Sequence, residues 1–323
     1  MNPRPKQERI PFNDSIILVA VGAALLLALV ACNKDDAGTN PIKPKPTYSE
    51  RWYFLWEGYA RVCLVYLPKD RASQAGLPVV FSLHSYDETY EELQDYLQTH
   101  LLGDSVGFIT VYPNAIEKHW NSGISDNPNY PTPNVNDVGF ISLIIDSLIK
   151  RYQIDTTRVY SCGGSNGGFM SLKLAAQLGS RITAVASVSG VISRGTGSSY
   201  STTRAVPTLL MHGTSDGQVP YNGDVTGWYS VDETIQFFRN RNSCLLPAET
   251  LFVANINTSD LSTVEKYTYR SSTNGSQVVL FKVINGIHSW PRWGPDPYGI
   301  RINRDIDATR EIWNFFKQFS LAP

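Results

Sequence analysis

A serine between glycines stands near the middle of the chain, where it could act as a nucleophile. Residues 159–170 read VYSCGGSNGGFM, so the pattern G-x-S-x-G runs from Gly163 to Gly167 between a β-prone run and a helix-forming run. A direct strand-to-helix turn is tight and strained, and a Cβ at either glycine would collide with neighbouring backbone. Such a turn lifts Ser165 clear of the sheet, and we therefore predict Ser165 as a nucleophile.

A nucleophilic serine needs two partners, and both residue types follow it in the chain. The hydroxyl is a poor nucleophile until a neutral imidazole accepts its proton, and the resulting imidazolium needs a carboxylate beside it. Asp216 lies in the loop after the apolar run 207–213, and His288 lies in the loop after the apolar run 277–284. The three residues stand at three strand ends in the order serine, acid, histidine. We predict Ser165 as nucleophile, Asp216 as acid and His288 as base.

Two other residues compete for these roles. Asp224 is an alternative acid, but it lies farther from the end of the strand than Asp216 does. His212 precedes a glycine at a strand end, and we predict that it is a buried structural histidine that holds the acid loop. His100 and His119 have no second ligand at metal spacing, so no metal site is predicted. The chemistry assigned to the three residues uses no cofactor.

Further residues are predicted to stabilise the oxyanion and to contact the substrate. An oxyanion needs N–H donors, normally from the residue after the nucleophile and from a loop after an early strand. These donors map to Asn166 and to Ser85 or Tyr86. Trp120 and Trp290 could each stack on an aromatic or sugar group of a substrate. Trp120 suits the protein core equally well, whereas Trp290 follows the predicted base by two residues and is expected in the pocket wall.

Strands and helices alternate along the chain that must position these residues. Apolar runs typical of strands lie at 61–68, 77–83 and 108–112, and an apolar stripe with helical spacing lies at 90–101. A second helical stripe at 141–152 leads into the strand before Ser165. The order β, α, β, α, β predicts an α/β fold in a single domain, with a mostly parallel sheet flanked by helices.

Two local signals concern the later part of the chain. Asn274 and Gly275 separate two apolar runs and predict a β-hairpin whose second strand leads to His288. Residues 191–206 are rich in Gly, Ser and Thr and are expected to form a loop near the mouth of the site.

Several runs together resemble one known family. The runs YSCGGSNGGFM, HGTSDGQVPY and IHSWP, with LPVVFSLHS and VGFISLIIDSLIKRYQID, are similar to those of the polyhydroxybutyrate depolymerase and feruloyl esterase family of secreted α/β-hydrolases. The resemblance covers residues 53–323. It implies the α/β-hydrolase fold, a serine esterase, and the triad already assigned from the residues.

The chain departs from the family pattern at two positions, and the resemblance also suggests a disulfide. The family usually has glycine where this chain has Ser85 and Ile287, and a serine restricts φ where a glycine does not. Related esterases can tether the strand before the nucleophile by a bridge. That resemblance suggests a disulfide between Cys162 and Cys244, which leaves Cys63 free.

The beginning of the chain carries an export signal. Basic residues precede an apolar run at 16–31, and Leu-Val-Ala-Cys ending at Cys32 matches the site read by lipoprotein signal peptidase. An uncleaved membrane anchor is the alternative, but the run is shorter than the roughly 20 residues needed to span a bilayer. We predict a lipoprotein signal peptide at 1–31, lipidation of Cys32, a Pro/Lys-rich tether at 32–47 and a catalytic domain at 48–323.

These observations lead to an expected function. A net charge of -1 with 18% charged residues provides no basic field for nucleic acid. We expect an exported serine carboxylesterase, held by the lipid on Cys32 at the outer membrane or cell surface. Its expected substrates are feruloyl or acetyl esters of plant polysaccharide, or polyhydroxyalkanoate oligoesters. A serine peptidase of the same fold and a non-catalytic glycan-binding surface lipoprotein are the alternatives.

Overall fold

The computed structural model describes residues 48–71, 74–294, 296 and 299–322. The predicted signal peptide at 1–31 and the tether at 32–47, which begins with Cys32, lie outside the described residues. Within the described ranges, no helix is long and apolar enough to cross a membrane.

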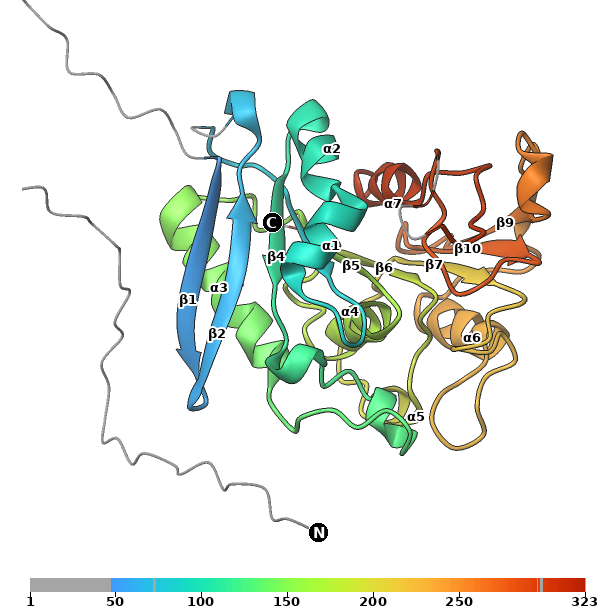
Figure 1. Ribbon diagram of the computed structural model, residues 1–323, viewed down its shortest axis with the longest axis horizontal. Coiled ribbons are helices and arrows are strands. Elements are labelled where there is room, and N and C mark those ends of the chain that lie inside the picture. The colour runs from blue at the N-terminus through green and yellow to red at the C-terminus, as the bar shows by residue number, and fades with distance from the viewer. Residues whose placement is uncertain (1–47, 72–73, 295, 297–298, 323) are drawn as a thin grey trace, which may run out of the picture. The chain divides into compact units, whose positions relative to one another are not determined.

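A single ten-stranded sheet organises the described chain, in the order β1-β2-β4-β3-β5-β6-β7-β10-β9-β8 (Figure 1). The six strands from β4 to β10 in this order are parallel, and antiparallel strands flank them on both sides. The strands are β1 (Ser49–Trp56), β2 (Tyr59–Tyr66), β3 (Val79–Leu83), β4 (Ile109–Pro113), β5 (Val159–Gly164), β6 (Ala184–Val188), β7 (Thr208–Gly213), β8 (Glu249–Phe252), β9 (Thr263–Arg270) and β10 (Gln277–Ile284). The predicted mostly parallel sheet is confirmed.

Helices cover both faces of the sheet, and each face has its own apolar core. The helices are α1 (Tyr90–Leu97), α2 (Thr99–Val106), α3 (Asp137–Tyr152), α4 (Asn166–Gln177), α5 (Arg194–Ser198), α6 (Val231–Arg241) and α7 (Ala308–Phe316), with short 3-10 turns η1 (Lys69–Arg71), η2 (Ile116–Lys118), η3 (Ile124–Asp126) and η4 (Thr258–Asp260). One core contains apolar side chains of α3, α4 and α6, and the other contains those of α1 and α7. The central strands β3 to β7 are buried along their length because helices lie on both sides.

The two cores explain why one sequence prediction is wrong. Cys162 belongs to the core on the α1 and α7 face, whereas Cys244 belongs to the core on the other face. Their side chains are separated by the sheet, and both cysteines, together with Cys63, are free and buried. The predicted disulfide between Cys162 and Cys244 is therefore not formed. The predicted hairpin is confirmed, since β9 and β10 pair antiparallel around Gly275, whose φ is +69°.

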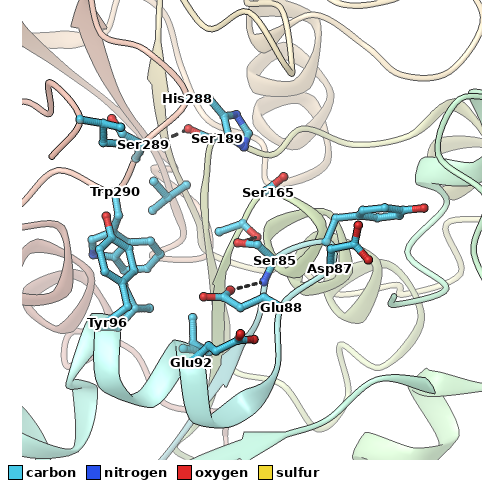
Figure 2. Close-up of a pocket in the computed structure, with 16 residues that line it drawn as sticks. Ser85, Asp87, Glu88, Glu92, Tyr96, Ser165, Ser189, His288, Ser289 and Trp290 are labelled. Carbon is cyan, nitrogen blue, oxygen red and sulfur yellow. Dashed lines mark hydrogen bonds between the residues drawn. The ribbon is translucent and has the colours of Figure 1, made fainter. Parts of the chain in front are cut away.

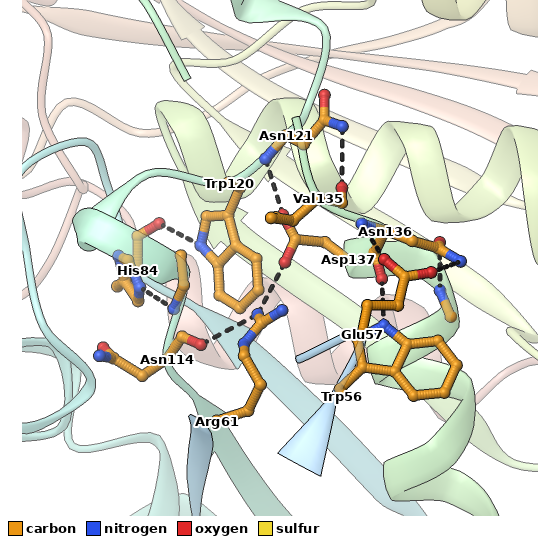
Figure 3. A network of polar contacts seen from close by, with 12 residues as sticks. Trp56, Glu57, Arg61, His84, Asn114, Trp120, Asn121, Val135, Asn136 and Asp137 are labelled. Carbon is orange, nitrogen blue, oxygen red and sulfur yellow. Dashed lines mark hydrogen bonds and ion pairs between the residues drawn. The ribbon is translucent and has the colours of Figure 1, made fainter. Parts of the chain in front are cut away.

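A buried ion pair ties the antiparallel edge of the sheet to the loop behind the predicted site (Figure 3). Arg61 of β2 donates to the Asp137 carboxylate at the start of α3 over 2.7 Å, and both side chains are fully buried. The other carboxylate oxygen accepts the Asn121 N–H at 2.7 Å, and Arg61 also donates to the Asn114 carbonyl. These bonds hold the segment from 114 to 121, in which the Trp120 N–H donates to the side chain of Asn166, the residue after Ser165, at 2.8 Å.

Candidate active site

Ser165 stands at the turn between β5 and α4 in a strained backbone conformation. Its φ is 48° and its ψ is -120°, values that an L-residue rarely adopts. The turn is possible because a Cβ on Gly167 would lie 2.1 Å from the Leu83 carbonyl oxygen, and one on Gly163 would lie 2.5 Å from the backbone of Gly167. The Ser165 N–H donates to the Val188 carbonyl at 2.8 Å, which anchors the turn to β6.

Asp216 and His288 meet although 71 residues separate them in the chain. The His288 Nδ1 lies 2.8 Å from Asp216 Oδ2, with the aspartate side chain fully buried and the histidine side chain 15% exposed. Asp216 Oδ1 accepts the N–H groups of Gln218 and Val219, so this carboxylate is oriented by its own loop. Because an ionised carboxylate can only accept, Nδ1 carries the proton and Nε2 is left as the basic nitrogen.

The environment of Asp216 keeps it ionised. Burial by itself would raise the pKa of this carboxyl, but the hydrogen bond and charge of His288, the nearby His212 and the Val219 N–H together bring its pKa below the ordinary value. A charged acid beside the base is what a developing imidazolium requires.

Ser165 and His288 line the same pocket and lie close to each other in it (Figure 2). No hydrogen bond joins the Ser165 hydroxyl to the His288 ring in the described structure. Catalytic hydrogen bonds are often long in the absence of substrate and tighten when it binds. The structure thus brings the three predicted residues to one site, with one of their two expected hydrogen bonds formed.

Asp224 and His212, the two alternative residues, are not members of the triad. Asp224 accepts the N–H groups of Thr226 and Gly227 within its own exposed loop and does not contact His288. His212 is buried, and its Nε2 lies 2.8 Å from the Val219 carbonyl oxygen and 3.4 Å from Asp216 Oδ2. Burial lowers the pKa of His212, which leaves a neutral ring that supports the loop of Asp216.

The residues predicted at the oxyanion site have different environments. The Asn166 N–H belongs to the first turn of α4, where the backbone donors have no partner within the helix. The Asn166 side chain is occupied, because it bonds the Trp120 backbone and the Ser122 hydroxyl. Ser85 and Tyr86 both line the pocket, but the Ser85 N–H already donates to Glu88 Oε2 at 2.8 Å (Figure 2).

The pocket around Ser165 has a volume of about 340 Å³. Trp290 forms part of its wall, as expected, and its indole N–H donates to the Thr309 hydroxyl. Trp120 is fully buried and its indole N–H donates to the His84 carbonyl, so the prediction that it stacks on a substrate is wrong (Figure 3). The expectation for residues 191–206 is also wrong, because the segment contains α5 and none of it lines this pocket.

Sequence reasoning missed an acidic and aromatic side of the pocket. Asp87, Glu88, Glu92 and Tyr96 all line it, and no lysine or arginine is among the described lining residues. The acidic residues after the strand at 77–83 are visible in the sequence. The sequence does not indicate that their side chains line the pocket. Among the described residues, no group of three or more His, Cys, Asp or Glu side chains could hold a metal ion.

Solved structures share this architecture. An acetyl xylan esterase from Aspergillus awamori has a TM-score of 0.54 at 16% sequence identity, covering 80% of this chain and 94% of its own. A thermostable esterase has a TM-score of 0.53 at 15% identity, covering 85% of this chain and 64% of its own. At these identities the likeness concerns the fold alone, which is the α/β-hydrolase fold.

Sequence comparison finds a family model and curated relatives that this chain resembles. Residues 61–219 match the family model of esterase PHB depolymerases, a range that includes Ser165 and Asp216 and ends before His288. A bifunctional acetylxylan esterase/xylanase from Neocallimastix patriciarum is 31% identical over 194 residues, which are 60% of this chain and 26% of that protein. Feruloyl esterase D from Neurospora crassa is 28% identical over 194 residues, 60% of this chain and 59% of that one. The family model covers just under half of this chain, and the chain spans only about a quarter of the length of the first of these relatives, so the comparisons show that this chain is similar to this family of esterases.

Proposed function

We propose that this protein is a serine carboxylesterase that works through an acyl-enzyme on Ser165. The observation that carries the proposal is the 2.8 Å bond between His288 and the buried Asp216, in a pocket that also contains the strained Ser165. Ser165 Oγ attacks the ester carbonyl while His288 Nε2 takes its proton, and the same proton then leaves with the alcohol. Water, deprotonated by His288, attacks the acyl-enzyme and releases the carboxylic acid and the free serine.

The substrates we propose are feruloyl or acetyl esters of plant polysaccharide, with polyhydroxyalkanoate oligoesters as the second class. The support is the naming of the relatives as acetylxylan and feruloyl esterases, together with the pocket lining. Tyr96 and Trp290 provide aromatic surface for a phenolic or sugar group. Asp87, Glu88 and Glu92 on the same pocket favour uncharged esters over anionic ones.

A panel of substrates tests this proposal. Purified protein should hydrolyse methyl ferulate, acetylated xylan or short 3-hydroxybutyrate oligoesters, and a fluorophosphonate probe should label Ser165. A dipeptide amide included in the panel separates an esterase from a peptidase of the same fold. Absence of both labelling and hydrolysis would support the glycan-binding alternative instead.

We also propose that the protein is an exported lipoprotein, attached through Cys32 at the outer membrane or cell surface. The support is the sequence that ends at Cys32 and the Pro/Lys-rich residues after it. Two acyl chains on one residue give stable membrane anchoring where a single chain would be marginal. Metabolic labelling with an alkynyl fatty acid should mark the wild type and not Cys32→Ala. An unlabelled wild type in its native host contradicts the proposal.

A further inference from the structure

In the loop after β3, the main-chain N–H groups of Ser85 and Tyr86 differ in whether the protein already supplies an acceptor. The Ser85 carbonyl accepts a hydrogen bond from His84 Nδ1 at 2.8 Å, and the Ser85 N–H donates to Glu88 Oε2 at 2.8 Å. No acceptor within the described residues takes the Tyr86 N–H. Of the two candidate donors, only Tyr86 therefore has an N–H available to a substrate.

His84 determines the direction of that N–H. Its Nε2 accepts the Ala115 N–H at 2.9 Å, so the ring proton resides on Nδ1 and is donated to the Ser85 carbonyl. His84 is fully buried, and the Ser85 carbonyl therefore points into the protein. In a trans peptide the N–H and C=O of the same unit point in opposite directions. The Tyr86 N–H consequently points away from the core, on the side where Tyr86 lines the pocket.

Glu88 closes the loop from the other side. Asp87 has a φ of 61°, a left-handed conformation that reverses the chain and lets the Glu88 side chain return to the Ser85 N–H. His119 holds the outer side of the turn through two contacts. Its ring stacks on the Tyr86 ring with 3.8 Å between the ring centroids, and its Nε2 lies 2.9 Å from Asp87 Oδ1. Ser85 itself has no positive φ, so a serine is tolerated where the family usually has glycine.

We propose that Glu88 is a positioning residue that holds the oxyanion loop so that the Tyr86 main-chain N–H, with that of Asn166, donates to the oxyanion. The inference rests on the proposed esterase function. What it requires of Glu88 is an acceptor atom at the correct distance from the Ser85 N–H, since the bond holds the His84–Ser85 peptide, which adjoins the peptide that carries the Tyr86 N–H. A negative charge at this place is not required, and near an oxyanion it would be unfavourable.

Three variants at position 88 separate the acceptor from the charge. Glu88→Gln keeps an acceptor oxygen at the same distance and loses the charge, and kcat should stay within about 3-fold of wild type. Glu88→Ala removes the acceptor, and kcat should fall about 10- to 100-fold with KM changed less than about 2-fold, because an oxyanion contact acts mainly in the transition state. Glu88→Asp keeps the charge one methylene short of the N–H and should behave like Glu88→Ala. The matched control is Glu91→Ala, since Glu91 lies three residues further along, in α1, does not line the pocket and forms a surface ion pair with Arg51.

An inhibitor provides a second readout. A trifluoromethyl ketone forms a hemiketal oxyanion on Ser165, so its Ki should rise in Glu88→Ala by the same factor as kcat falls. The proposal is overturned if Glu88→Asp retains activity while Glu88→Gln loses it, because charge would then be the requirement. It is also overturned if Glu88→Ala raises KM alone, which would make Glu88 a substrate contact, or leaves kcat unchanged. Thermal unfolding checks that each variant is folded, and a wild type without esterase activity would instead contradict the proposed function.

Discussion

The surroundings of Ser165, Asp216 and His288 suit each residue to a different part of the reaction. Asp216 is buried and bonded by its own loop, His288 is mostly buried and bonded to it, and Ser165 stands on strained backbone. The side chains of Asp216 and His288 and the backbone of Ser165 are held by contacts that do not depend on a substrate. Such preorganisation is what allows a general base and a nucleophile to act without rearrangement during the reaction.

The first prediction concerns these three residues. Ser165→Ala and His288→Ala should each reduce kcat by roughly 10⁴-fold or more with folding retained, because the nucleophile or its base is missing. Asp216→Asn should be severe as well, since an amide no longer selects the tautomer of His288. Steady-state hydrolysis of p-nitrophenyl acetate measures the effects. Asp224→Asn is the control and should be nearly silent; a loss there with an active Asp216→Asn would reassign the acid.

At the scale of elements, the turn between β5 and α4 depends on close backbone contact with the end of β3. Gly167→Ala should destabilise the protein by several kcal/mol or abolish activity, because its Cβ would lie 2.1 Å from the Leu83 carbonyl oxygen, and backbone must move. Gly217→Ala is the matched control beside Asp216, since a Cβ there meets no atom within 4 Å. Urea unfolding and ester hydrolysis measured on both variants compare the two sites. Equal stability of the two variants would show that the strand-to-helix turn can relax.

The link between β2 and α3 leads to a third prediction. The side chains of Arg61 and Asp137 are both fully buried, and burial raises the pKa of Asp137 even with Arg61 beside it. Asp137→Ala should lower the free energy of unfolding by about 3–5 kcal/mol, because it leaves a buried guanidinium without its carboxylate. Asp146→Ala, on the same helix, breaks the partly exposed pair with Arg181 and should cost about 1 kcal/mol at most. Denaturant titration of both variants tests the contrast, and similar losses would contradict it.

For the whole molecule, buried histidines make stability depend on pH. Burial lowers the pKa of His84 to about 4, and it also lowers the pKa values of His212 and His100. Unfolded histidines take up protons below about pH 6.5, so between roughly pH 4 and 6.5 the unfolded state binds more protons than the folded state. Stability is then fully present above this window and falls as the pH drops through it.

This fourth prediction can be measured by unfolding at pH 7, 6, 5 and 4. His84 alone should contribute a loss of about 3 kcal/mol across the window. His84→Asn should be less stable than wild type at pH 7 and should show a weaker acid dependence, because one proton uptake is removed. A wild-type unfolding free energy that stays constant from pH 7 to pH 5 would contradict the assignment of neutral buried histidines.

The sequence by itself determined the features that depend on local pattern. The glycines around Ser165, the alternation of apolar runs and the Asn274-Gly275 turn each follow from constraints within a few residues. The order of Ser165, Asp216 and His288 at strand ends could also be read from the chain, because parallel strands bring their carboxyl ends to one edge.

Only the tertiary structure decided which side of the sheet or loop each side chain faces. Cys162 and Cys244 lie on opposite faces, and Trp120 turns into the core behind the site while Trp290 lines the pocket. Whether the N–H of Ser85 or of Tyr86 is free depended on where Glu88 and His84 point. These outcomes follow from packing and hydrogen bonding between segments distant in the chain, which no pattern within a single segment encodes.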